Sequence, residues 1–558
     1  MCNTLIKIAS AIILFFAIIL NFFGNLFGIG DIIPTEPKTT EETSISETVT
    51  EDLTSGDFIT TEEPTTEEST TAETTTEKTT FQPMTRPSMP TATATTGAST
   101  PATRPATTVE IGMRVKSATL TDSVAFGGTN TDTYTGFAPL SDGGFVVSGV
   151  SNSTDGNLLN VPSDGWKKTG YGFVAKYNKN LELEWVNAVG SEEDGVRIED
   201  VAVLSDGSIV AVGSSSAVDF ASDKKYAGSL EGIIIRYSAD GKETDRKFFG
   251  GSGSDVFKCI APIGDGFVVG GGTTSVNGDF ADSGDSTKTK ALIISFDAEG
   301  NRIWNRYLSG NYGASVNGVA TDEKGNIFIT TVTSATTGGF AAIEGLGKGF
   351  VDTAVIKYNS SGEIQWTAAV SGAGRENFDS VTADGRGGCV VAGYYELVNT
   401  YEPDGTLEGM YACGGIDAVA IKFNSNGTIR WRRSIAGVGD DFISDVISVD
   451  NGFAVVGYTN SSNRDFSKCG NKGEIDSFVA LITPEGNLAD VKSLGGARKE
   501  KSACVGYTSD KKLIVLSQTT SSDGDFDGMN THISDVLINI LGDIYTGHIS
   551  KYKISVSY

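Results

Sequence analysis

The sequence predicts an all-β fold, a seven-bladed β-propeller of four-stranded antiparallel blades, behind an N-terminal transmembrane helix and a disordered stalk. Three observations lead to this prediction. Glycine junctions recur about every 60 residues, short alternating apolar runs and turn signals follow each junction, and helix signals are missing from these units. Composition divides the chain into a membrane anchor (residues 1–30), a stalk (31–108) and the repeat region (109–558).

The first segment is a long apolar run. From Leu5 to about Ile29 the chain is nearly uncharged, and roughly 20 such residues span a bilayer as a helix. Lys7 precedes the run while Asp31 and Glu36 follow it, which places the N-terminus in the cytoplasm and the remainder outside the cell. A cleaved signal peptide is the alternative, although its apolar region is usually about 7–15 residues long. Both interpretations export the repeat region.

The second segment, residues 31–108, is dominated by Thr, with Glu in its first half and Pro and Ala in its second. It holds too little apolar surface to offset the entropy of ordering, so we expect it to be disordered. Thr/Pro-rich tracts are typical of extended stalks. We therefore expect a spacer that lifts the repeat region away from the membrane.

The repeat region is organised by its junctions. They lie at Gly127-Gly128, Gly190, Gly250-Gly251, Gly310, Gly372, Gly437 and Gly495-Gly496. A hairpin turn such as Asp142-Gly143 follows each junction strand, and a β-branched run such as Phe145-Val146-Val147 comes next. The third strand is the clearest, as in Phe173–Tyr177, and the fourth carries Trp185, Trp304, Trp366 or Trp431. Four short strands per unit predict radial sheets around an axis, with the Trp side chains filling the wedges between them.

Closure of the ring is predicted from one extra strand. Val115–Phe126 precedes the first junction, where a final strand belongs, so it can complete the seventh unit and remove the open edge. The tail Lys551–Tyr558 also alternates, and it either competes for that place or adds an outer strand.

The third unit resembles a bacterial exported β-propeller repeat family. The resemblance rests on Gly250-Gly251-Ser252-Gly253-Ser254-Asp255, Asp265-Gly266, Gly278-Asp279-Phe280 and Gly300-Asn301-Arg302-Ile303-Trp304. It covers about Val109 to Leu541, and the second, sixth and seventh units depart from it by lacking the Trp. The resemblance implies an exported scaffold or binding domain and fixes no reaction.

Charge and cysteine content exclude some partners. The net charge of -27 argues against nucleic acid, which needs a basic face. The six cysteines have no regular spacing and predict no disulfide framework, although pairing of Cys389 with Cys413 is left open. We expect the propeller to be monomeric.

A polar residue follows each junction and forms a candidate ring. A ligand-binding interpretation has this ring hold a cation or a polyhydroxyl ligand at the channel mouth. The alternative is that these short side chains cap the turns. The ring consists of Asp132, Asp194, Asp255, Ser315, Asn377, Asp441 and Glu500.

The loop Asp523–Gly528 is a candidate calcium site. Asp523, Asp525 and Asp527 match the first half of a Ca²⁺-binding loop, but Ser534 replaces the final Glu. The alternative is a polar turn without metal. No other cofactor is predicted.

Catalytic signals are weak. The two histidines, His532 and His548, are too few for a histidine zinc site, and no catalytic residue is assigned. The first functional hypothesis is a non-enzymatic cell-surface binding or adhesion module for a glycan, cell-wall or protein ligand. The alternatives are an extracellular polysaccharide hydrolase or lyase and a structural or sensory ectodomain. Specific sites are expected where the units differ, at Asn157–Gly170, Glu396–Gly415 and Asp523–Gly528.

Overall fold

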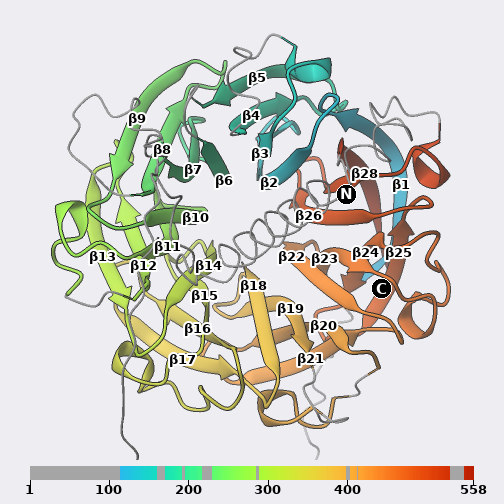
Figure 1. Cartoon of the computed structure of the whole chain (residues 1–558). Helices are drawn as coiled ribbons and strands as arrows, with labels where there is room; N and C mark the ends of the chain where they lie inside the picture. The colour runs from blue at the N-terminus through green and yellow to red at the C-terminus, as the bar shows by residue number, and fades with distance from the viewer. Residues whose placement is uncertain are drawn as a thin grey trace, which may run out of the picture. The chain divides into compact units, whose positions relative to one another are not determined.

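The computed structural model describes residues 114–159, 170–190, 195–216, 229–284, 288–396, 403–410, 413–527 and 546–557. Its strands form seven antiparallel sheets of four strands each, arranged as blades around a central axis (Figure 1). The predicted seven-bladed propeller is therefore confirmed. The predicted anchor (1–30) and stalk (31–108) lie outside the described residues, and no helix within the described part is long and apolar enough to cross a bilayer.

The first four blades follow the chain from the innermost strand outward. Blade 1 contains β2 (Asp132–Pro139), β3 (Phe145–Ser151), β4 (Tyr171–Tyr177) and β5 (Leu183–Val189), and blade 2 contains β6 (Val196–Val203), β7 (Ile209–Ser215), β8 (Glu231–Tyr237) and β9 (Glu243–Phe249). Blade 3 contains β10 (Asp255–Ile263), β11 (Gly266–Thr273), β12 (Lys290–Phe296) and β13 (Arg302–Leu308), and blade 4 contains β14 (Ala314–Thr321), β15 (Ile327–Thr333), β16 (Asp352–Tyr358) and β17 (Ile364–Val370).

The last three blades include the one that closes the ring. Blade 5 contains β18 (Arg375–Ala383), β19 (Cys389–Glu396), β20 (Ile416–Phe423) and β21 (Ile429–Ile435), and blade 6 contains β22 (Asp441–Val449), β23 (Gly452–Thr459), β24 (Asp476–Ile482) and β25 (Leu488–Leu494). Blade 7 contains β26 (Glu500–Tyr507), β27 (Lys512–Thr519), β28 (Thr546–Ser557) and β1 (Arg114–Phe126).

The N-terminal strand completes blade 7 as predicted. β1 pairs antiparallel with β28 from Arg114–Ser557 to Phe126–Gly547, so the two ends of the propeller lie side by side at the rim. The role expected for the tail was wrong. The tail forms β28, the third strand of the blade, and lies between β27 and β1 instead of competing with β1 or adding an outer strand.

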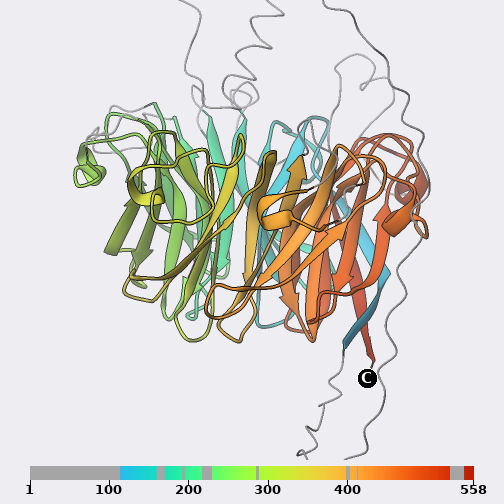
Figure 2. The ribbon, with the colours of Figure 1, turned by 90° about the horizontal axis from the view of Figure 1, so that it is seen from below.

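The two faces of the propeller differ. One face, the loop face, carries the connections between blades and the loops that precede each third strand. The opposite face, the turn face, carries the tight hairpins, and β1 begins there beside the end of β28 (Figure 2). The chain therefore enters the propeller on the turn face, away from the loops.

The hydrophobic core lies between the blades. Each cluster of buried side chains draws on neighbouring sheets; one example joins Val268 and Ile293 of blade 3 to Ile329 and Ile356 of blade 4. A single four-stranded sheet leaves both of its faces exposed to water, and stacking the sheets radially buries these faces.

Four tryptophans fill the wedges at the rim, as predicted. The ring of Trp304 in β13 packs on the turn glycine Gly362 of the next blade, and its indole N–H donates to the carbonyl of Ser360 at 2.9 Å. Trp366 and Trp431 donate in the same way to the turn of the following blade. These three Trp residues therefore fasten one blade to the next one, whereas Trp185 packs on Gly241 without an acceptor for its N–H among the described residues.

The pairing of Cys389 with Cys413 is not formed, since both thiols are free. Cys389 begins β19 opposite Phe423, whereas Cys413 precedes β20 at the other end of the same strand pair. Seven or more residues of extended chain, roughly 20 Å, separate the two ends.

Candidate functional site

Buried carboxylates cap the loops between blades. The Oδ2 atom of Asp132 accepts the backbone N–H of Gly128 at 2.8 Å, and the hydroxyls of Ser151 and Ser153 donate to the same carboxylate. Asp132 is fully buried, and this burial raises its pKa to about 6. The amide four residues earlier donates in the same manner to Asp255, Glu376, Asp441 and Glu500. These contacts are those of turn caps, and they leave little carboxylate surface for a ligand.

The predicted ring differs from the observed one in blades 2, 4 and 5. In blade 2, Val196 occupies the capping position opposite Ser215. Asn377 lies one residue beyond the capping position, which Glu376 occupies, and Ser315 lies one residue beyond Ala314. Both predicted residues lie five residues past the junction glycine, whereas the capping residue lies four past it, as the hydrogen bond from Gly372 to Glu376 shows. Asp194 lies outside the described residues. Asn377 instead donates to the hydroxyl of Tyr394 at 3.3 Å.

The Asp-Phe motifs form short 3₁₀ turns that close the loop face. Each turn buries an apolar side chain, and the residue before the turn usually accepts an N–H from the neighbouring junction loop. The turns are η1 (Gly156–Leu158), η4 (Gly278–Phe280), η5 (Gly338–Phe340), η6 (Gly405–Leu407), η7 (Arg464–Phe466) and η8 (Gly524–Phe526).

The predicted calcium residues belong to the turn η8. Asp523 accepts the N–H of Ala497 at 2.8 Å, and Asp525 accepts the N–H of Gly495 at 2.9 Å and pairs with Lys472. Among the described residues, no group of three or more His, Cys, Asp or Glu side chains converges as metal ligands do. Calcium at this loop stays a prediction, and His532 and residues 528–531 lie outside the described part.

The central channel contains a second ring that the sequence did not predict. Every innermost strand carries a β-bulge at the same place, where its register with the second strand shifts. Such bulges re-aim side chains. The bulge residues line a cavity of about 440 Å³, and this bulge ring consists of Thr135, Glu199, Lys258, Asn317, Asp379, Ser444 and Ala503.

One arc of the bulge ring is polar and hydrogen-bonded. Lys258 Nζ donates to Asn317 Oδ1 at 2.9 Å, and Asn317 Nδ2 donates to Asp379 Oδ1 at 2.7 Å. These three side chains come from blades 3, 4 and 5.

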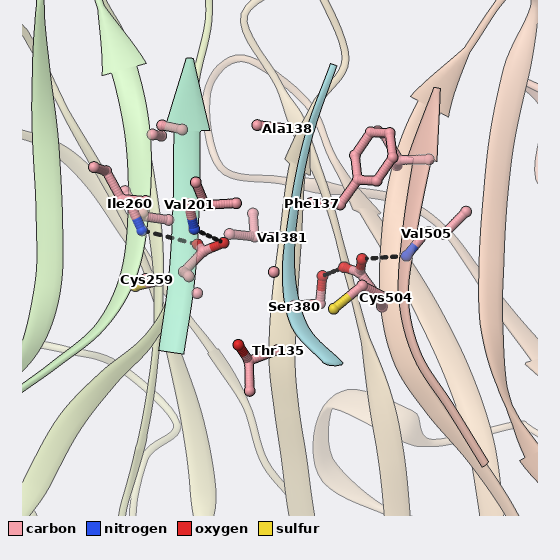
Figure 3. Close-up of a pocket in the computed structure, with 18 of the residues that line it drawn as sticks. Thr135, Phe137, Ala138, Val201, Cys259, Ile260, Ser380, Val381, Cys504 and Val505 are labelled. Carbon is pink, nitrogen blue, oxygen red and sulfur yellow. Dashed lines mark hydrogen bonds between the residues drawn. The ribbon is translucent and has the colours of Figure 1, made fainter. Parts of the chain in front are cut away.

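The rest of the ring is mixed, since Ser444, Thr135 and Glu199 are polar and Ala503 is apolar. The half-buried Phe137 also borders the cavity (Figure 3). The channel therefore has one hydrogen-bonded arc across blades 3 to 5 and a remainder of mixed polarity.

Two further carboxylates beside the ring hold neighbouring blades together. Asp200 accepts the N–H of Ile260 at 2.9 Å, and Asp445 accepts the N–H of Val505 at 2.9 Å (Figure 3). Ser380 also donates to Asp445 at 2.6 Å. Enclosure within the protein raises the pKa of Asp200 to about 7 and that of Asp445 to about 6, and their mutual repulsion adds to the shift at Asp200.

No protein-family model matches the sequence, and no curated protein matches it either. Several solved structures align with most of the chain at low identity. The chain is similar to the WD40 domain of Pan2 from Neurospora crassa, with 8% identity, a TM-score of 0.40, and coverage of 79% of this chain and 96% of that one. It is also similar to the WD40 β-propeller domain of Doa1, with 11% identity, a TM-score of 0.39, and coverage of 79% and 97%. A protein of unknown function from Dyadobacter fermentans matches with 11% identity, a TM-score of 0.38, and coverage of 78% and 99%.

Proposed function

We propose that this chain is a non-enzymatic binding module, displayed outside the cell, which takes a polar group of a glycan or cell-wall ligand into its central channel. The observation that carries the proposal is the Lys258–Asn317–Asp379 chain of hydrogen bonds. The repeated carboxylates are committed to turn amides, whereas the bulge ring differs from blade to blade. A site that varies among equivalent units is where specificity is expected.

The shape and chemistry of the channel support a sugar. A cavity of about 440 Å³ falls within the range of small-molecule sites, roughly 300–1,000 Å³. The polar arc offers an ammonium, an amide and a carboxylate to hydroxyl groups. Phe137 and Ala503 add a small apolar surface that suits the apolar face of a sugar ring.

The direction of the chain supports display from a membrane. β1 begins on the turn face, so the chain before it joins the propeller on the face away from the loops. We therefore propose a single-pass protein with a cytoplasmic N-terminus, and a propeller that acts as a monomer outside the cell.

A polysaccharide hydrolase has one observation in its favour. Asp200 and Asp445 have pKa values of about 7 and 6, which suits acid–base work near neutral pH. Their oxygens, however, accept backbone N–H groups of the next blade. A carboxylate held in this way positions strands, and it is poorly placed to exchange protons with a substrate.

The test is a glycan and cell-wall array probed with residues 31–558. We expect binding that weakens at least tenfold, about 1.4 kcal/mol, in Lys258→Met and in Asp379→Asn. Lys324→Met, an exposed lysine outside the channel, is the matched control and keeps full binding. Turnover of a polysaccharide would favour the hydrolase. Absence of binding to any array member would favour the structural or sensory ectodomain.

A further inference from the structure

Two buried carboxyl groups meet at the border between blades 4 and 5. Asp352 begins β16, the third strand of blade 4, and Glu376 lies near the start of β18, the innermost strand of blade 5. A parallel bridge between Val351 and Arg375 brings the strands together, and the N–H of Glu376 donates to the carbonyl of Val351 at 2.8 Å. Asp352 is 1% exposed and Glu376 is 2% exposed.

The hydrogen bonds around the pair leave one oxygen without a donor. Asp352 Oδ2 accepts the N–H groups of Gly347 and Lys348, the latter at 3.3 Å. Glu376 Oε2 accepts the N–H of Gly372 at 2.9 Å. Within the described residues, Oδ1 of Asp352 has no donor, although it is buried beside Glu376. An unsatisfied buried oxygen costs about 1–3 kcal/mol, so a missing donor is implied.

The charges that act on this pair are mainly acidic. Asp404 lies close to Glu376, and its Oδ1 accepts the N–H of Ala373 at 2.8 Å. The guanidinium of Arg375 pairs with Glu396 at 3.7 Å, and both of these side chains are exposed. Two carboxyl groups bond to each other when one of them keeps its proton, because an ionised carboxylate is an acceptor alone.

We propose that Asp352 and Glu376 share one proton, and that this proton holds the border between blades 4 and 5 closed. The proton sits between Glu376 and the free oxygen of Asp352 and supplies the missing donor. Its loss would place two negative charges side by side in a buried site. The border would then loosen at the loops 371–376 and 403–410 of the loop face.

The pKa of Glu376 agrees with this arrangement. Burial first, and then the charge of Asp352, raise it to about 8 from the ordinary 4.5. The folded protein therefore holds a proton that the unfolded chain releases above about pH 4.5. Stability from this group is complete below the unfolded pKa and is lost as the pH rises through about 8.

The next border shows what a satisfied pair looks like. Asp417 faces the capping Asp441 between blades 5 and 6. Asp417 accepts the hydroxyl of Tyr395 at 2.9 Å and the N–H groups of Cys413 and Gly414 at 2.9 and 3.1 Å. Donors surround Asp417, so no shared proton is required there.

The border between blades 6 and 7 resembles that between blades 4 and 5 instead, since Asp476 Oδ1 also lacks a donor among the described residues and lies beside Glu500. Glu376 differs from Glu500 in that burial, and then a stronger influence of the Asp beside it, raise its pKa to about 8.

The experiment is unfolding by denaturant between pH 6 and 9, using the full chain. For the wild type, one shared proton contributes about a tenfold loss in the folding equilibrium constant per pH unit up to about pH 8. Glu376→Gln carries a permanent donor, and we expect it to remove that contribution. Asp352→Asn is the second variant, and it should remove the same pH dependence of the folding equilibrium constant. Glu396→Gln, an exposed carboxyl on the same blade, is the control and keeps the wild-type slope.

A direct titration covers the case in which a variant fails to fold. Carboxyl ¹³C NMR of the wild type should show one Asp or Glu side chain titrating near pH 8. The proposal is overturned if no carboxyl titrates above pH 7, or if Glu376→Gln folds and keeps the wild-type slope. It is also overturned if Ca²⁺ removes the dependence of stability on pH and a chelator restores that dependence, because a cation would then occupy the place of the proton.

Discussion

The carboxylate of Asp200 in blade 2 accepts the backbone N–H of Ile260 in blade 3 at 2.9 Å, across the border between two sheets. Its other oxygen accepts the N–H of Val201 at 2.8 Å. Within the described residues, neighbouring sheets share at most single backbone bridges, such as Val351–Arg375, so this side chain adds a hydrogen bond between blades 2 and 3 at the channel. Asp445 repeats the arrangement toward Val505.

Removal of the Asp200 side chain should therefore destabilise the ring. We expect Asp200→Ala to lower the free energy of unfolding by about 1–3 kcal/mol, because two N–H groups lose their acceptor. Denaturant unfolding measures this change. Glu323→Ala, on an exposed turn, should fall within about 0.5 kcal/mol of the wild type. An equal loss in both variants would show that the cross-blade bond contributes little.

The Trp wedges can be tested at the glycine beneath them. Gly362 has φ of +72°, and an added Cβ would lie 2.9 Å from the ring of Trp304. Gly264 has φ of +57° with nothing within 4 Å, so Gly264→Ala measures the backbone strain alone. We expect both to destabilise by about 1 kcal/mol through the backbone, and Gly362→Ala to lose a further 1–3 kcal/mol, roughly, through the clash. Equal losses of stability in the two variants would mean that the Trp304 ring moves aside without cost.

The channel carboxylates predict a pH dependence in the acidic range. Their pKa values, about 7 for Asp200 and about 6 for Asp445, lie above the ordinary 3.8. The folded state thus binds more protons than the unfolded chain, and stability falls as the pH rises from about 4 to 7. Asp445→Asn should show a shallower fall than the wild type in a pH series of thermal unfolding. A protein whose stability rises over this range would contradict the assignment.

The closing strand is open to a deletion test. A chain that begins after Phe126 leaves β28 as an unpaired edge at the rim of blade 7, and exposed edges promote aggregation. We expect this chain to aggregate or to lose cooperative unfolding, as followed by size-exclusion chromatography and circular dichroism. Addition of a peptide of residues 114–126 should restore the monomer, whereas a chain that begins at residue 109 should behave as the wild type. A stable monomer without β1 would refute its role in closure.

The fold could be predicted because its signals are local. Asp-Gly turns, β-branched runs and recurring Trp residues each report on a few neighbouring residues, and their repetition reveals the blades. The third strand of blade 7 was missed because its partner β27 ends at Thr519 and β28 begins at Thr546. That spacing departs from the other units, so the repeat gave no guide to the tail.

The channel could not be predicted because its members are distant in sequence. Lys258 and Asn317 are 59 residues apart, and Asn317 and Asp379 are 62 apart. A bulge has no signature in one strand, since it depends on the register with a partner. The capping carboxylates were noticed because they recur, and recurrence is what marks an architectural residue. The channel site differs among units, so the repeat pattern alone could not reveal it.

The pairing of β1 with β28 also determines how the ring responds to mechanical load. β1 enters at the turn face and runs antiparallel to β28 along its full length. A pull on residue 114 away from the loop face is directed along the strand, so it loads the inter-strand hydrogen bonds together in shear. A pull across the strand would instead break them one after another, as a zipper opens. A propeller held at its loop face and tethered through β1 would thus resist extension in its stronger direction.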